Sequence, residues 1–150
     1  MPSTSPVTSA GLWTSTPGQV KVLPLTGLDP VVGSGPSGFA IAVQGTSGPL
    51  FTTYSASGAV QCGPVSMGDS SFKPAGIVAT PKGYLVVSSG VVRGQEVHSD
   101  CSLGPIFAID AGPKDDMVRV AAGAAGYGVV WQDGAAKVPK RRLFGANFCD

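Results

Sequence analysis

The sequence predicts an all-β fold made of three repeated units, each with four strands. Three observations support this prediction. Short apolar runs are separated by turn residues, no segment shows convincing helical periodicity, and one strand pattern returns three times. Glycine occurs 22 times and proline 13 times in 150 residues. These residues lie between the apolar runs, which is typical of a turn-rich β protein.

The repeat becomes visible when three segments are aligned on a glycine followed by an aromatic residue. These glycines are Gly38, Gly83 and Gly126, so the segments start about 45 and then 43 residues apart. A β-branched residue follows two positions after each aromatic, and another apolar residue lies six positions before each glycine. The matching sets are Phe39, Tyr84 and Tyr127; Ile41, Val86 and Val129; and Val32, Ile77 and Val120. Agreement at several positions in three copies indicates a structural repeat.

In each unit, one strand is expected before the glycine, a second is expected to start at the glycine, and a third is expected after the turn that ends the second. A fourth apolar run follows in the first two units, whereas the sequence stops before it in the third. The expected strands are 30–33, 38–43, 50–54 and 64–67; 76–79, 83–90, 95–98 and 105–109; and 117–121, 126–134 and 138–144.

The segment "QVKVLPL", residues 19–25, occupies the fourth-strand position before the first glycine. It is expected to complete the last unit, which would join the two ends into one ring or join one chain to the next. Such an arrangement also hides sheet edges. The expected organisation is an N-terminal arm rich in Ser, Thr and Pro, residues 1–18, and a single repeated β domain, residues 19–150.

Two architectures fit three four-stranded units. One is a β-propeller, in which each unit is a blade of about 40–45 residues. Three blades do not close by themselves, but six blades from a dimer, or further blades of a longer chain, would close a ring. The alternative is a β-trefoil, which closes within one chain of this length.

The segments "AGIVATPKGYLVV", "MVRVAAGAAGYGVVWQDG" and "LFTTYSASGAVQCG" resemble the repeats of bacterial secreted β-propellers. The resemblance implies blades with an apolar inner strand, and an extracellular or surface-associated protein. Only the third copy has the complete "VVWQD", because Val43 and Ser88 stand where that copy has Trp131. The repeats of β-trefoil lectins are the competing resemblance, but this chain lacks a regular Gln-x-Trp in each copy.

The charge and hydropathy of the chain argue against two classes of partner. The net charge is +1, so there is no basic field for nucleic acid. No apolar stretch approaches the roughly 20 residues that span a bilayer. The short basic run "KVPKRR" is expected on a solvated strand face or edge. The first residues, "MPSTSPVTSAG", do not have the pattern of a signal peptide.

No set of residues predicts catalysis, a metal or a cofactor. Glu96, His98 and Asp100 alternate around the single histidine, so they are expected on one exposed strand face with Cys101 directed away. A metal bound by these three residues is the less favoured interpretation. The acids Asp110, Asp115 and Asp116 do not have the spacing of a calcium loop, and they indicate a turn between strands.

The three cysteines, Cys62, Cys101 and Cys149, follow the third strand of each unit. They are expected either as small buried residues or as partners in a disulfide, within the chain or between chains.

Ligand contacts are predicted for aromatic residues and their polar neighbours, because an aromatic face beside an amide or acid can stack on a sugar. Packing inside the fold is the alternative interpretation for the tryptophan of the third copy. The function expected is a non-catalytic interaction module that recognises a glycan or a protein surface. The alternative is a structural subunit of a homo-oligomer or other multi-chain assembly. The candidate ligand-binding residues are Trp131, Gln132, Asp133, Trp13 and Tyr54.

Overall fold

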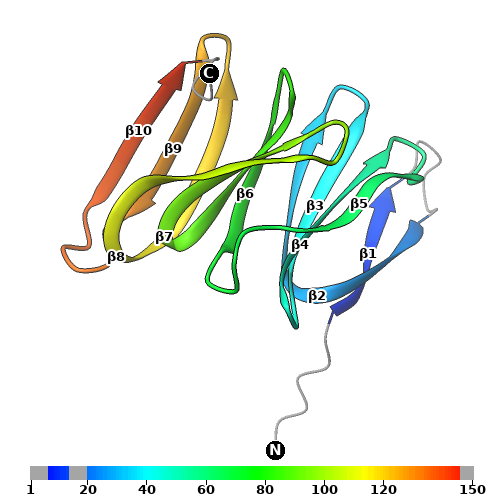
Figure 1. Ribbon diagram of the computed structural model, residues 1–150, viewed down its shortest axis with the longest axis horizontal. Coiled ribbons are helices and arrows are strands. Elements are labelled where there is room, and N and C mark those ends of the chain that lie inside the picture. Colours follow the sequence, from blue (N-terminus) through cyan, green and yellow to red (C-terminus); the bar gives the residue numbers. More distant parts are fainter. Residues whose placement is uncertain (1–6, 14–19, 146–150) are drawn as a thin grey trace, which may run out of the picture.

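The computed structural model describes residues 7–13 and 20–145, with the backbone alone for 7–13, 20–22, 24, 25 and 113–116. All its regular elements are strands, which confirms the prediction of an all-β fold (Figure 1). They are β1 (Val7–Trp13), β2 (Val20–Gly35), β3 (Gly38–Gly45), β4 (Gly48–Ser55), β5 (Val60–Ser66), β6 (Lys73–Thr80), β7 (Gly83–His98), β8 (Leu103–Gly123), β9 (Gly126–Gln132) and β10 (Pro139–Gly145).

The strands form three small antiparallel sheets that follow one another along the chain. The first sheet contains the end of β2 with β3, β4 and β5. The second contains β6, β7 and the first part of β8. The third contains the last part of β8 with β9 and β10. The beginning of β2 pairs with β1, so β2 and β8 each link two groups of strands.

The strand β7 folds back on itself, so that residues 83–90 lie beside residues 91–98. Gly90 has a φ of 86° at this turn. Inside the turn, the Ser88 Oγ accepts a hydrogen bond of 3.2 Å from the backbone N–H of Arg93. The second unit therefore contains four lengths of strand, as the first unit does.

The three repeat glycines occupy the same place in each unit. Each of these glycines begins a length of strand, and each lies opposite the end of the next length of strand. The glycines are Gly38, Gly83 and Gly126, and for Gly83 the next length is the second half of β7. A Cβ at any of them would run into a backbone carbonyl oxygen of that neighbour, and the residues concerned are Tyr54, Val97 and Phe144. A larger residue would push the strands apart, which explains why glycine returns at this position. The structure thus supports the predicted repetition of sheet units.

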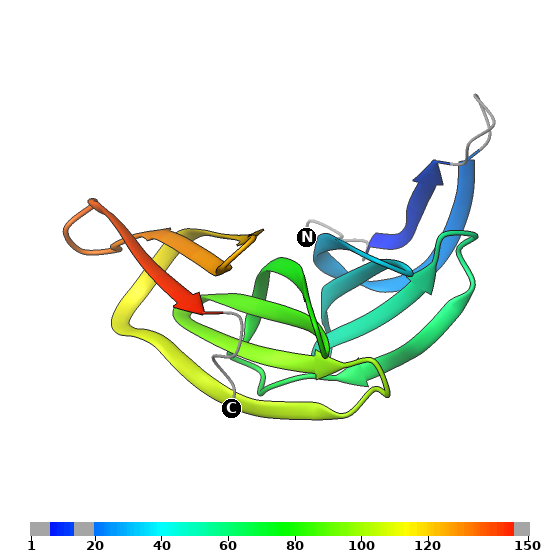
Figure 2. The ribbon, with the colours of Figure 1, turned by 90° about the horizontal axis from the view of Figure 1, so that it is seen from above.

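The three sheets stand side by side in an open arc, which does not close into a ring in the part of the chain described (Figure 2). The strand that precedes the repeat glycine in each unit is called its inner strand: the end of β2, β6 and the last part of β8. Across the sheet boundaries, β2 contacts β6, and β6 contacts β8. Gly33 of β2 lies against Ile77 of β6, and Gly76 of β6 lies against Val120 of β8. Glycine in these strands allows close approach of the neighbouring sheet.

Apolar side chains fill the spaces between neighbouring sheets and form three cores. The core between the first and second sheets contains Ala40, Ala42, Phe51, Met67, Phe72, Ile77, Tyr84, Val86 and Val97. The core between the second and third contains Val78, Leu85, Val87, Val92, Ile109, Val118, Tyr127, Val129 and Trp131. The remaining face of the first sheet is covered by β2, with Leu23, Ile41, Val43 and Tyr54.

The N-terminal segment differs from the expected pairing. Residues 20–25 belong to β2, which pairs with β1 rather than with the third unit. β1 itself lies within residues 1–18, for which the sequence indicates an arm. Since β1 and β2 are near in sequence, a hairpin between them closes a shorter loop than a contact with the last unit would.

Candidate functional site

Trp131 lies in the core between the second and third sheets. Its side chain is on β9 and only 6% exposed. The indole Nε1 donates a hydrogen bond of 3.0 Å to Asp110 Oδ2, which comes from β8. This contact satisfies the only polar atom of the indole, and the ring packs among the apolar residues of both sheets.

Lys140 of β10 joins Asp110, in the part of β8 that pairs with β7, to Asp133 of the third unit. Its Nζ lies 3.2 Å from Asp110 Oδ2 and 2.6 Å from Asp133 Oδ2. The backbone N–H groups of Ala136 and Ala135 donate to Asp133 Oδ1 at 2.7 and 2.9 Å. These N–H groups, Ala136 first, and Lys140 lower the pKa of Asp133 to about 2. The same two acids raise the pKa of Lys140.

The pKa of Asp110 is also lowered, first by the backbone N–H of Gly112 and then by Lys140 and Trp131. Gln132 makes a weak contact nearby, with its Nε2 3.4 Å from the carbonyl oxygen of Lys137. Of the predicted trio, Gln132 contacts Lys137 within the third unit. Trp131 directly, and Asp133 through Lys140, are linked to Asp110 of the second sheet.

Tyr54 lies on β4 in the first sheet, far along the chain from Trp131 and in a different core. Its side chain is 2% exposed. Its ring stacks on Phe39 with 5.3 Å between centroids. Burial raises the pKa of its hydroxyl, against a hydrogen bond with Thr52. The side chain of Trp13, also predicted to bind a ligand, lies outside the described residues.

A hollow of about 310 Å³ opens beside Tyr54. We call it the N-terminal hollow, because it lies on the side of the first sheet over which the beginning of β2 passes. It is lined by Thr26, Val43, Leu50, Thr52, Tyr54, Val60 and Pro64.

Glu96, His98 and Asp100 lie near one another, but they do not share one exposed face. The Glu96 side chain is buried and accepts a hydrogen bond of 2.7 Å from Thr80 Oγ1. His98 Nε2 lies 3.3 Å from Glu96 Oε2, and its Nδ1 lies 2.9 Å from Ser102 Oγ. β7 ends at His98, so Asp100 lies in the following turn. Ser102 donates to Asp100 Oδ1 through both its Oγ and its backbone N–H, an arrangement that shapes this turn.

No group of three or more His, Cys, Asp or Glu side chains among those described is placed to hold a metal ion. The side chains of Asp115 and Asp116 are outside the described set. The Asp110 carboxylate contacts Lys140 and Trp131. Cys62 of β5 and Cys101, in the turn after β7, form a disulfide with 5.7 Å between Cα atoms. Cys149 lies outside the described residues.

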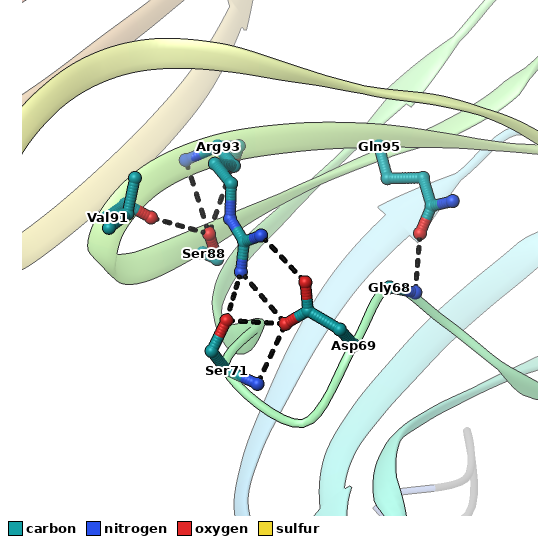
Figure 3. Close-up of polar contacts among 7 residues, drawn as sticks. All are labelled: Gly68, Asp69, Ser71, Ser88, Val91, Arg93 and Gln95. Atoms are coloured by element: carbon teal, nitrogen blue, oxygen red, sulfur yellow. Dashed lines mark hydrogen bonds and ion pairs between the residues drawn. The ribbon is translucent and has the colours of Figure 1, made fainter.

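Arg93 holds the loop between β5 and β6 against β7 (Figure 3). Its Nη1 lies 3.0 Å from Asp69 Oδ2, and its Nη2 donates to Ser71 Oγ at 2.9 Å. Gln95 Oε1 accepts a hydrogen bond of 2.9 Å from the backbone N–H of Gly68 in the same loop. Arg93 and then Ser71 hold the pKa of Asp69 well below its usual range. These contacts fix the loop that links the first and second units.

The outward side of the third sheet exposes large apolar side chains. We call this surface, defined by Met117, Val130 and Leu143, the terminal face. These side chains are 70%, 49% and 79% exposed, respectively. Two hollows border the face, of about 430 Å³ beside Leu143 and about 300 Å³ between Met117 and Val130.

The equivalent surfaces of the other two units are covered. The second and fourth residues after the repeat glycine are Ala40 and Ala42 in the first unit, and both are buried. In the second unit these positions hold Leu85 and Val87, which are also buried. In the third unit the fourth residue is Val130, which is exposed. The terminal face is therefore a surface that the repeat normally covers with the next sheet.

The terminal face is a candidate binding surface that no motif in the sequence indicates. The alternation of side chains along the three aligned strands indicates the face on which Val130 lies, because Val130 is in register with Ala42 and Val87. What it did not indicate is that no described element packs over this position.

No helix in the described part of the chain combines the length and apolar character needed to cross a membrane. Comparison of the chain with protein-family models, with curated proteins and with solved structures found no match.

Proposed function

We propose that this protein is a non-catalytic interaction module, which binds a protein surface through the terminal face of its repeated β scaffold. The observation that supports this most strongly is the exposure of Val130, whose counterparts in the other two units are buried. Exposed clusters of apolar side chains rimmed by polar groups often mark protein interaction sites. Arg119 and Arg141, which pair with Val130 across the sheet, supply exposed polar neighbours.

The protein form of this proposal is better supported than the glycan form. A sugar would need an accessible aromatic ring. Trp131 and Tyr54 are both buried, and they lie in different cores. The open side chains of the terminal face are aliphatic or thioether, and such groups favour a dry contact with another apolar surface.

We also propose that the units are blades of a β-propeller type, as in the secreted bacterial repeats that the sequence resembles. The inner strands β2, β6 and β8 lie next to one another, while β5 is an edge strand of the first sheet. This radial order of strands supports blades more than the closed barrel of a trefoil.

An extracellular or surface-associated location forms part of the same proposal. The disulfide between Cys62 and Cys101 supports it, because disulfides persist in oxidising compartments and are rare in the cytosol.

The test is a comparison of two aspartate variants of the whole chain. Val130→Asp places a charge on the terminal face. Val91→Asp makes the same change at a valine of similar exposure, 44% against 49%, near the fold of β7. Protein partners are captured from extracts of the source cells, identified, purified and retested for direct binding. We expect the wild type and Val91→Asp to bind a partner that Val130→Asp loses. Equal binding by all three proteins would reject the terminal face as the binding surface.

A further inference from the structure

We propose that the terminal face of one copy of this protein docks, head to tail, on the N-terminal side of the first sheet of a second copy. This inference rests on the proposed function, and it names the partner as the chain itself. The structure already contains two interfaces between neighbouring sheets, and both have the arrangement that such docking would repeat.

Both internal interfaces have the same polarity. The second and fourth residues after the glycine of one unit meet the first and third residues after the glycine of the next unit. In the first interface, Ala40 and Ala42 share a core with Tyr84 and Val86. In the second interface, Leu85 and Val87 share a core with Tyr127 and Val129. Each sheet therefore has one side that faces forward along the chain and one that faces backward.

The forward side is left open at the third sheet, on the terminal face. A complementary surface must therefore be a backward side of the same type. The first sheet has such a side, where Phe39 and Ile41 occupy the first and third positions. The beginning of β2, with Leu23, buries Ile41, Val43 and Tyr54 on this side. The part left open is the N-terminal hollow and Val60, which is 56% exposed.

Val32, on the inner strand of the first unit, likewise has no described neighbouring strand to cover it. Its counterparts, six residues before the glycine, are Ile77 and Val120. Each of these is approached closely by a glycine of the preceding inner strand, Gly33 and Gly76 respectively. Val32 is 68% exposed, and no described inner strand precedes it. In the proposed complex, the last part of β8 from another copy lies beside β2, just as β2 lies beside β6 within the chain.

The chain thus carries the forward half of one repeated interface at one end, and an open part of the backward half, beside Val32 and Val60, at the other. Head-to-tail docking would continue there an interface that forms twice within each chain. Such a contact is heterologous, so it generates a ring if the rotation closes and a filament if it does not.

The experiment uses sedimentation equilibrium on the whole chain with one variant for each surface. Val130→Asp disables the terminal face, and Val32→Asp disables the opposite end. Both residues are exposed in the single chain, so a thermal melt is expected to show that each variant folds as the wild type does. Val91→Asp is the matched control.

We expect the wild type and Val91→Asp to associate, and each of the other variants alone to be a monomer. An equimolar mixture of Val130→Asp and Val32→Asp is expected to give a dimer and nothing larger, because one intact surface of each type remains. A mixture that stays monomeric would overturn the proposal. So would a Val32→Asp variant that still dimerises alone, since this indicates two terminal faces in contact. A wild type that is monomeric at every concentration rejects the second copy as partner, but leaves the proposed function to its own capture test.

Discussion

Gly33 of β2 and Ile77 of β6 lie in close backbone contact at the boundary between the first and second sheets. A Cβ built on Gly33 would lie 2.7 Å from the Ile77 Cβ and 2.7 Å from its carbonyl oxygen. Since one of these atoms is backbone, the neighbouring strand cannot move away at low cost. The contact therefore sets how tightly the inner strands of the arc pack together.

Gly33→Ala is expected to destabilise the fold by about 1–3 kcal/mol, the usual cost of overpacking a well-packed site. Urea denaturation measures the change. Gly145→Ala is the control, because a Cβ there meets nothing within 4 Å, and its effect should stay within about 0.5 kcal/mol. Equal stability of the two variants would show that the sheets separate more easily than this packing implies.

Trp131→Phe removes the indole N–H that Asp110 accepts and leaves space in the core between the second and third sheets. We expect a loss of about 2–4 kcal/mol, from the hydrogen bond to a charged group and the smaller ring together. Chemical denaturation, followed by far-ultraviolet circular dichroism, measures it. If the variant is as stable as the wild type, the indole contributes little to joining these sheets.

The acid stability of the protein is expected to depend on Lys140. The pKa of Asp133 is about 2 in the folded protein, below its value of about 3.9 in an unfolded chain. A lowered pKa gives stability that is present above about pH 4 and is lost as the pH falls towards about 2. Lys140→Met removes one cause of the shift, while the backbone donors remain. The drop in melting temperature over this range should therefore become smaller but not vanish.

The control for this experiment is Lys73→Met, which removes an exposed lysine of β6. It should keep the wild-type acid dependence, including the part that comes from Asp69 beside Arg93. Added salt should reduce the difference between Lys140→Met and the wild type, because the Lys140 side chain is 39% exposed. Identical pH profiles for all three proteins would contradict the assigned role of Lys140.

Reduction of the disulfide should destabilise the protein strongly. Cys62 and Cys101 are 39 residues apart, and the loop-entropy relation gives about 4 kcal/mol for a loop of this length. The measurement is urea denaturation with and without dithiothreitol, in a Cys149→Ser background that removes the third thiol. Peptide mapping should find Cys62 linked to Cys101. A mapped peptide that links either residue to another chain would contradict the intramolecular bond.

Much of the fold could be predicted from strand patterns. The glycine–aromatic repeat located β3, the first half of β7 and β9, because only glycine fits where these strands begin beside a carbonyl of the next strand. The expected strands 105–109 and 117–121 both occur, joined in the single long element β8. β1 was not predicted, since a segment rich in Ser, Thr and Pro has no alternation that indicates a strand.

The candidate site was harder to predict, because alternation shows which residues share a face but not what covers that face. Trp131 has the same sequence character whether it is open to a ligand or buried. Its burial depends on Asp110, 21 residues earlier, and on the second sheet. Val130 is an ordinary strand valine in sequence, and its exposure is a property of the missing neighbour.

The all-β class, the period of the units and the glycines that begin their middle strands all follow from the amino-acid pattern. These features depend on backbone sterics and on contacts close in sequence. Three further features became known from the three-dimensional arrangement: Cys62 bonds to Cys101, β2 pairs with β1, and the terminal face is open at one end of an arc. Those outcomes depend on how whole sheets stack, because each sheet has two faces and the strand pattern alone does not tell which neighbour either one meets.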